Sequence, residues 1–465
     1  IDTKTGKKLW KYEHRLPEGI MPCCDVINRG AALYDNLVIF ATLDAQIVAL
    51  NQDTGAVVWK EKIDEYSAGY SASAAPLIAG GLLLTGVSGG EFGVIGRVEA
   101  RDPKTGKMVW VRPTVEGHMG YKYVDGKAVE NGISGTTNKT WPGELWKSGG
   151  ATTWLGGTYD STTGLAYFGT GNPAPWNSHL RPGDNLFSTS TVAIDVKTGQ
   201  IKWSYQNTPN DGWDYDGVNE LVMADLPIDG KNTKVIMQAN RNGFFYVLDR
   251  ASGKLLRANQ FARTVNWATG VDMKTGRPID TPMTAAVRKT EEMADPVEVW
   301  PSAFGGKNWM PMSFDPQRKL AFFNTVDLGM KVRYTKQAKP GGPNWWLGLE
   351  LAGFVSPKDG NRGSVVAYDP VTGKKVWEVL QKAPNWAGVL STASGVVFTG
   401  TQTGQFKAYD SANGKELWSL PLEGTPTGIP VALGRVVVAR CLEMGFASAG
   451  VCEARPIERE REFRA

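Results

Sequence analysis

The sequence lacks the residue runs that mark membrane, nucleic-acid and haem proteins. No apolar run approaches the length of about 18 residues that a membrane span needs, and the first residues do not form a signal segment. The 51 basic and 47 acidic side chains leave a net charge of +4, and no block of like charges occurs before the last dozen residues. A nucleic-acid partner is therefore not expected. No Cys-x-x-Cys-His string occurs, which excludes a c-type haem attached within the chain.

Glycine and tryptophan, by contrast, are abundant. The chain has 55 Gly in 465 residues, well above an average usage of about 7 %, and its 17 Trp outnumber the 16 Phe and the 14 Tyr. This composition favours many tight turns and repeated aromatic anchors. A chain of 465 residues suggests about three domains of roughly 150 residues each, but a single repeat architecture can have the same length.

A motif with an Asp, a Thr-Gly turn and a Trp recurs along the chain. The clearest copies run over 1–10, 50–59 and 101–110, further copies end at Trp203, Trp377 and Trp418, and a degenerate copy over 249–256 has lost its Trp. Each copy predicts a β-hairpin, in which one strand ends at the Asp, the Gly takes a positive φ, and the next strand carries the Trp. Alternating apolar runs supply further strands at 37–41, 82–87, 165–169 and 396–400.

The repeat predicts an all-β chain built from four-stranded blades of about 40 to 50 residues. A blade cannot bury its own faces, so radial stacking with Trp wedged between neighbours gives a β-propeller with a ligand site on its axis. We interpret the repeated Trp residues as packing groups between blades and assign them no catalytic role.

Five strings interrupt the repeat with residues that its folding does not require. They cover 21–30, 86–93, 169–177, 210–217 and 305–309. Taken singly, most have a plain interpretation as turns or solvated loops. The first contains Cys23 and Cys24, whose Cα atoms lie about 3.8 Å apart, closer than the usual disulfide range of about 4.4 to 6.8 Å. A bond between them would be strained, so the residues alone indicate two buried thiols.

Together the five strings resemble the pyrroloquinoline quinone (PQQ)-dependent alcohol dehydrogenases of the methanol and ethanol dehydrogenase type, which are eight-bladed β-propeller quinoproteins. The match runs from Ile1 to about Thr427. The resemblance implies an eight-bladed propeller over 1–427, incomplete at both ends, and a divergent charged tail over 428–465. The chain opens inside a copy of the motif and without an initiator Met, so we expect a processed form or a fragment.

The resemblance also implies a cofactor and ion site. Cofactor-binding residues would be Cys23, Cys24, Arg29, Ser73, Ser88, Gly89, Gly90, Trp154, Arg241, Asn308 and Trp386. The catalytic residue would be Asp214, and the metal ligands would be Glu91, Asn172, Asp214 and Asp216. With the family and an oxidising periplasm in view, a vicinal disulfide between the two cysteines becomes the better interpretation.

The residue types suit the chemistry that the resemblance implies. A hard cation makes an ortho-quinone a better hydride acceptor, and hard cations prefer oxygen ligands such as those of Glu91 and Asn172. Asp214 can take the hydroxyl proton if the cation and Arg241 keep it ionised. Trp154 offers a flat face to a planar cofactor. For Arg241 the alternative is a structural ion pair with a neighbouring Asp.

Asp216 departs from the calcium-type members, which have an uncharged residue there, and resembles the lanthanide-dependent branch. A second carboxylate two positions after Asp214 adds charge and ligand oxygens, which suits a trivalent ion better than a divalent one. The alternative is that Asp216 only caps a turn. We favour a lanthanide over Ca²⁺.

The resemblance implies a periplasmic enzyme that oxidises a small primary alcohol to the aldehyde by hydride transfer to metal-bound PQQ and passes electrons to a cytochrome c. Assembly as a homodimer is left open. The alternative function is a non-catalytic propeller, either an outer-membrane assembly scaffold or an inactive fragment of such an enzyme. A scaffold would have no reason to hold Glu91, Asn172 and Asp214 together with Arg241.

Overall fold

The computed structural model describes residues 2, 5, 7–22, 26–131, 136–338, 344–428, 430–433, 436–442 and 451–452. These residues form antiparallel β-sheets with one α-helix, α1 (Pro282–Val287). Short 3-10 helices lie in the loops: η1 (Tyr66–Ala68), η2 (Gly90–Phe92), η3 (Thr137–Thr140), η4 (Leu145–Ser148) and η5 (Ser178–Leu180). Within the described ranges, the helices are all too short or too polar to cross a membrane.

Six sheets of the described chain each contain four antiparallel strands that follow one another across the sheet. The first three are β1 (Ala32–Tyr34), β2 (Leu37–Ala41), β3 (Gln46–Asn51) and β4 (Val57–Lys62); β5 (Leu77–Ala79), β6 (Leu82–Gly86), β7 (Arg97–Arg101) and β8 (Met108–Pro113); and β11 (Thr158–Asp160), β12 (Leu165–Gly169), β13 (Ser190–Asp195) and β14 (Ile201–Gln206). The next three are β15 (Val222–Ile228), β16 (Lys231–Ala239), β17 (Phe244–Asp249) and β18 (Leu255–Gln260); β22 (Ser313–Asp315), β23 (Leu320–Asn324), β26 (Gly363–Asp369) and β27 (Lys374–Gln381); and β28 (Val389–Ser391), β29 (Val396–Thr401), β30 (Gln405–Asp410) and β31 (Glu416–Pro421).

The remaining strands are additions to this pattern. They are the hairpin β9 (Tyr121–Val124) and β10 (Lys127–Glu130), which extends the second sheet; the pair β19 (Ala268–Val271) and β20 (Pro278–Asp280); and the sheet of β21 (Val297–Val299), β24 (Gly329–Tyr334) and β25 (Leu349–Val355). A small last sheet holds β32 (Thr425–Pro426), β33 (Val431–Leu433) and β34 (Val436–Leu442), and β35 (Val451–Cys452) pairs with β34.

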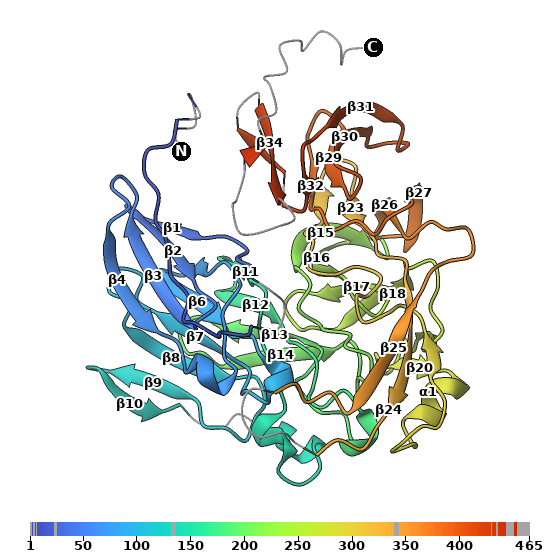
Figure 1. Ribbon diagram of the computed structural model, residues 1–465, viewed down its shortest axis with the longest axis horizontal. Helices are drawn as coiled ribbons and strands as arrows, with labels where there is room; N and C mark the ends of the chain where they lie inside the picture. Colours follow the sequence, from blue (N-terminus) through green and yellow to red (C-terminus); the bar gives the residue numbers. More distant parts are fainter. Residues whose placement is uncertain are drawn as a thin grey trace.

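The sheets are arranged around a common centre in chain order, from the blue β1–β4 to the red β28–β31 (Figure 1). The all-β propeller expected from the repeat is confirmed. The described residues contain six four-stranded blades and the small last sheet, so the number of eight blades stays a prediction.

Tryptophan and glycine join one blade to the next. The indole N–H of Trp110 on β8 donates to the Val196 carbonyl at 2.8 Å, in the turn before β14. A Cβ added at Gly199 would lie 2.7 Å from the Trp110 ring, and Gly199 also has a φ of +69°. The same contact is repeated at Trp10 with Gly55, Trp59 with Gly106, Trp203 with Gly253, and Trp377 with Gly414. The turn glycine is therefore required both by backbone conformation and by the ring that packs on it.

At the degenerate motif the contact between neighbouring blades is kept, but other side chains make it. Arg257 faces Val247 across the ladder, the position that Trp59 occupies opposite Ala49. Its Nε donates to the Val371 carbonyl of the next blade at 3.4 Å, and an added Cβ at Gly373 would meet Asn259. A guanidinium thus replaces the indole N–H donor that the motif has lost.

Candidate active site

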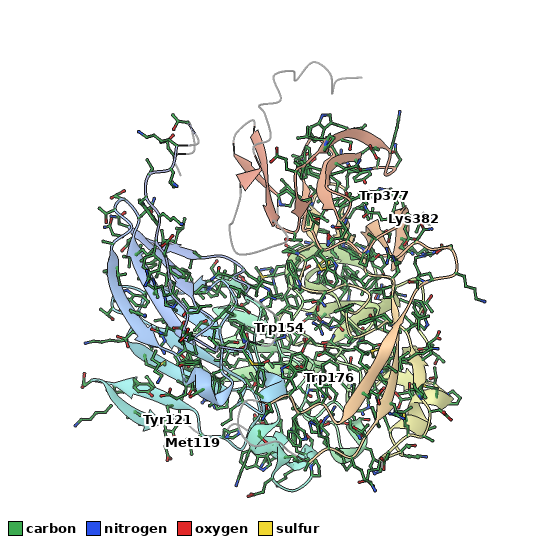
Figure 2. All side chains as sticks on the ribbon, in the orientation of Figure 1. Met119, Tyr121, Trp154, Trp176, Trp377 and Lys382 are labelled. Atoms are coloured by element: carbon green, nitrogen blue, oxygen red, sulfur yellow. The ribbon has the colours of Figure 1, made fainter. Side chains whose placement is uncertain are left out.

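Loops that leave the strands at the centre of the molecule carry the predicted site residues. Glu91 lies in η2 after β6, Asn172 follows β12, and both Asp214 and Asp216 lie between β14 and β15. Trp154 precedes β11, and Figure 2 shows it near the middle of the molecule. Segments far apart in the sequence therefore meet around one indole.

Asp216 connects three separate parts of the chain. Its Oδ1 accepts the backbone N–H of Asn172 at 2.5 Å, and its Oδ2 accepts the indole N–H of Trp154 at 3.0 Å. Nη1 of Arg241 lies 3.2 Å from the same Oδ2. The side chain is buried, with 3 % of the residue exposed. Asp216 therefore bridges the site rather than facing solvent at its own turn.

Asp214 and Arg241 form an ion pair in which Arg241 is buried and Asp214 is half-buried. Nη1 of Arg241 donates to Oδ2 of Asp214 and to its backbone carbonyl, both at 2.8 Å. Nη2 donates to Oδ1 of Asn308 at 3.3 Å, and the guanidinium carbon lies 5.6 Å from the centre of the Trp154 ring. The ion pair considered for Arg241 does occur, and its partners are the two aspartates of the predicted site.

The acidic groups of the site lie in an environment that disfavours their charged forms. Burial raises the pKa of Asp214 well above its usual value and also raises the pKa of Asp216, while Arg241 opposes both shifts. Burial and the negative charge of Asp216 raise the pKa of Glu91, and a hydrogen bond from Asn172 opposes this. Three carboxylates thus share the positive charge of Arg241, which leaves an excess of negative charge.

This donor set fits a hard cation. Three carboxylates and the Asn172 side-chain amide offer oxygen ligands, and a cation among them would offset the excess charge. Among the described residues, no three His, Cys, Asp or Glu side chains lie close enough together to hold a metal ion. The assignment of Glu91, Asn172, Asp214 and Asp216 as metal ligands stays a prediction.

One wall of the site presents cations and aromatic rings. Nη1 of Arg29 donates to Oγ of Ser73 at 2.6 Å, and this oxygen lies 3.4 Å from Oγ of Ser88. The Arg29 guanidinium carbon lies 4.8 Å from the centre of the Trp154 ring and 5.6 Å from that of Trp309. With Arg241 on the same indole, this wall fits a flat molecule with anionic substituents. Trp309 was missed as a site residue, although its string was singled out.

The other predicted cofactor residues border this region. Asn308 donates to the Phe304 carbonyl at 3.0 Å, and Phe304 lies edge-on to Trp386 with ring centres 5.4 Å apart. Gly89 has a φ of +112°, and an added Cβ there would collide with the Gly69 carbonyl, so the turn before Glu91 needs glycine. Gly90 lies beside Asn172, with 3.8 Å between its added Cβ and the amide oxygen. Cys23 and Cys24 lie outside the described residues, so their disulfide stays a prediction.

Sequence reasoning also missed two buried cationic side chains, each with a hydrogen-bond partner in another loop. Lys307 is fully buried, and its Nζ donates to Glu220 at 2.7 Å and to the Asn308 carbonyl at 3.1 Å. Arg181, also fully buried, donates to the Asp211 carbonyl. Both pairs lie within or next to the strings singled out above, but nothing in a single sequence joins their members.

Comparison with known proteins identifies the family. The sequence profile described as "Glucose/ethanol/alcohol dehydrogenase, beta-propeller domain" matches residues 1–258, more than half of the chain. The chain belongs to this family. A second profile, that of the outer membrane protein assembly factor BamB, matches residues 361–449.

Individual relatives point the same way. The chain is 53 % identical over 388 residues to the quinoprotein alcohol dehydrogenase PedH of Pseudomonas putida, covering 83 % of this chain and 64 % of PedH. It is 40 % identical over 372 residues to the lanthanide-dependent methanol dehydrogenase of Methylacidiphilum fumariolicum, covering 78 % of this chain and 59 % of that enzyme. A solved europium-containing methanol dehydrogenase has 36 % identity and a TM-score of 0.85, with 93 % of this chain and 76 % of that chain covered. The chain thus spans less than two thirds of the length of these two curated relatives.

Proposed function

We propose that this chain is the propeller of a PQQ-dependent alcohol dehydrogenase that oxidises a primary alcohol to the aldehyde. One observation carries the proposal: Asp214 and Asp216 share Arg241 beside the face of Trp154. A propeller that only mediates protein assembly does not need buried carboxylates gathered around a guanidinium. The similarity to PedH and to the lanthanide-dependent enzyme supports PQQ with a lanthanide or Ca²⁺ as cofactors.

The mechanism assigns a role to each wall of the site. PQQ and its metal ion, when bound, supply an electrophilic quinone that accepts a hydride. Trp154 would support the flat cofactor, Arg29 would bind it, and Arg241 would contact its quinone oxygens. The ion would be held through oxygen atoms by Glu91, Asn172, Asp214 and Asp216. Asp214 would accept the hydroxyl proton of the alcohol, and the positive charge of Arg241 would keep its carboxylate ionised between turnovers.

Several features of the whole enzyme belong to the same proposal. Residues 1–427 would form the propeller domain and 428–465 a separate tail. The enzyme would work in the periplasm, where an oxidising environment supports a Cys23–Cys24 disulfide. Electrons would pass to a cytochrome c, as the resemblance to the family implies.

A scaffold function is the second candidate, because the BamB profile matches residues 361–449. This match covers later blades and leaves out all four proposed metal ligands, which lie between Glu91 and Asp216. It therefore accounts for the blade repeat but not for the buried acidic site.

Reconstitution tests the proposal. The purified chain is incubated with PQQ and either La³⁺ or Ca²⁺, and the absorbance of bound PQQ and the ethanol-dependent reduction of an artificial electron acceptor are recorded. We expect bound PQQ and turnover that both require the metal ion. A chain that binds neither PQQ nor metal would support the scaffold or the inactive fragment.

A further inference from the structure

Asp214 has an unusual backbone conformation. Its φ is +62°, in the left-handed region that residues with a side chain rarely adopt. Such a residue persists only where its surroundings hold it in place, and the strain is often found at functional positions. The direction of the Asp214 carboxylate therefore depends on whatever fixes this turn.

Asp211 holds the turn on both sides of Asp214. Its Oδ1 accepts the backbone N–H of Trp213 at 3.1 Å, and its Oδ2 accepts that of Tyr215 at 2.9 Å. The residue is buried, with 1 % exposed. One carboxylate thus binds the residue before and the residue after the strained position.

Arg181 ties the same turn to the loop that carries Asn172. Its guanidinium donates to the Asp211 carbonyl, to the Pro175 carbonyl at 2.5 Å and to the Trp176 carbonyl at 3.2 Å. In return, the side-chain amide of Asn210 donates to the Arg181 carbonyl at 2.9 Å. The loops that bear Asn172 and Asp214 therefore cannot shift independently.

Charge supports this arrangement. Burial raises the pKa of Asp211 to about 6, while Arg181 and the two backbone N–H groups oppose the rise. These donors stabilise the ionised form, which is the form that can accept both hydrogen bonds.

We propose that Asp211, supported by Arg181, is a positioning residue that fixes the carboxylate of Asp214 for proton transfer and ion binding. This inference rests on the proposed function for the role of Asp214. Both carboxylate oxygens of Asp211 are taken up by the backbone N–H groups of Trp213 and Tyr215. Its effect must therefore pass through Asp214, which separates it from a residue that only stabilises the fold.

The first experiment needs no cofactor. In Asp211→Asn, the amide places an N–H donor against one of the two backbone N–H groups, so that bond is lost with little change in shape. Asp160→Asn is the matched control, because Asp160 is also buried, accepts the Thr162 N–H at 2.9 Å and lies 3.1 Å from Nε of Arg250. By hydrogen exchange and mass spectrometry, Asp211→Asn should speed exchange in the 211–217 segment roughly tenfold or more. Unchanged exchange there overturns the proposal, whether or not the chain is an enzyme.

The second experiment is a double-mutant cycle. Terbium luminescence measures Tb³⁺ affinity, and dye reduction with PQQ and La³⁺ measures kcat and KM for ethanol, in Asp211→Asn, Asp214→Asn and the double variant. We expect the two changes to be strongly non-additive, with the double variant no worse than Asp214→Asn, because Asp211 acts through Asp214. We expect kcat to fall and KM to stay nearly constant, and Asp160→Asn to match the wild type in both.

The outcomes distinguish the positioning role of Asp211 from the proposed function of the chain. Additive losses from Asp211→Asn and Asp214→Asn would overturn the positioning role even in an active enzyme. A wild type that neither binds Tb³⁺ nor turns over ethanol would overturn the proposed function, and the exchange experiment would still decide whether Asp211 holds the turn.

Discussion

At the scale of single residues, the two aspartates of the 210–217 loop are held in different ways. Asp214 pairs with Arg241 from a strained turn, while Asp216 accepts hydrogen bonds from Trp154 and Asn172. The carboxylate with fewer fixed partners is the better candidate for proton transfer. The carboxylate of Asp216, which has more fixed partners, is better placed to shape the ion site.

Asp214→Asn should lower kcat by roughly 10² to 10⁴, the range expected for loss of a positioned general base. The amide cannot accept the hydroxyl proton, but it keeps the shape of the side chain, so PQQ content should stay nearly unchanged. Steady-state kinetics and the absorbance of bound PQQ check both points, with the exposed Asp225→Asn as control. Unchanged turnover in a variant that holds PQQ would remove Asp214 from the mechanism.

Asp216→Ala should reduce lanthanide-supported activity much more than calcium-supported activity. The attraction of a carboxylate grows with ion charge, so a trivalent ion loses more when this oxygen donor is removed. Activity is titrated with La³⁺ and with Ca²⁺ in parallel, and Asp44→Ala, at a buried position paired with His14, controls for general destabilisation. An equal loss with both ions would place the enzyme with the calcium-dependent members.

At the scale of elements, the joint between Trp110 and Gly199 can be tested with two glycine variants. Gly199→Ala and Gly164→Ala both force a side chain to a positive φ, at +69° and +71°. Only the first places a Cβ against an indole, because nothing lies within 4 Å of an added Cβ at Gly164. We therefore expect Gly199→Ala to lower the free energy of unfolding by about 1–3 kcal/mol more than Gly164→Ala.

Urea unfolding followed by tryptophan fluorescence measures this difference between the two variants. Equal losses would mean that backbone strain alone requires the glycine and that the ring adapts without cost.

The elements also show what the sequence could predict. The motif predicts the hairpins because its Asp, Gly and Trp act within one turn and its neighbours, and apolar alternation predicts strands such as β12 and β29. The pattern gave no sign that Arg257 replaces a tryptophan, because a guanidinium fills that position only once Val371 of the next blade is beside it. The sheet of β21, β24 and β25 was missed for a similar reason, since its strands are separated in the chain by β22 and β23.

The site residues also divide into those that the sequence indicates and those that only the folded chain shows. The strings that interrupt the repeat contain Asp214 and Asp216, and the resemblance to a family assigns roles to both of them and to Arg241. Asp211 and Arg181 carry no such signal, because their importance comes from hydrogen bonds to backbone atoms that meet only in the folded chain.

At the scale of the whole molecule, the proposed site draws residues from loops of at least three blades, from Glu91 after β6 to Arg241 after β16. A ligand that binds all of them should stabilise the assembled ring rather than a single blade. With PQQ and La³⁺ at about 100 times the dissociation constant, we expect a gain of about 2.7 kcal/mol in the free energy of unfolding. Thermal unfolding with and without the ligands measures it.

Glu91→Gln provides the control for this measurement, because it removes one charged ligand and leaves the indole and the arginines in place. It should lose most of the metal-dependent gain. A wild type whose melting temperature does not change when both ligands are added would contradict a shared central site.

The docking of tryptophan on glycine has a consequence for how such rings change during evolution. Each complete repeat carries the Gly that receives an indole from the repeat before it and the Trp that reaches the repeat after it. Neighbours are therefore interchangeable at these joints, and a duplicated or deleted repeat would still meet matching surfaces on both sides. The joint of Arg257 and Asn259 with Gly373 departs from this rule, since its partners are polar. Exchange of whole blades should be tolerated least at that boundary.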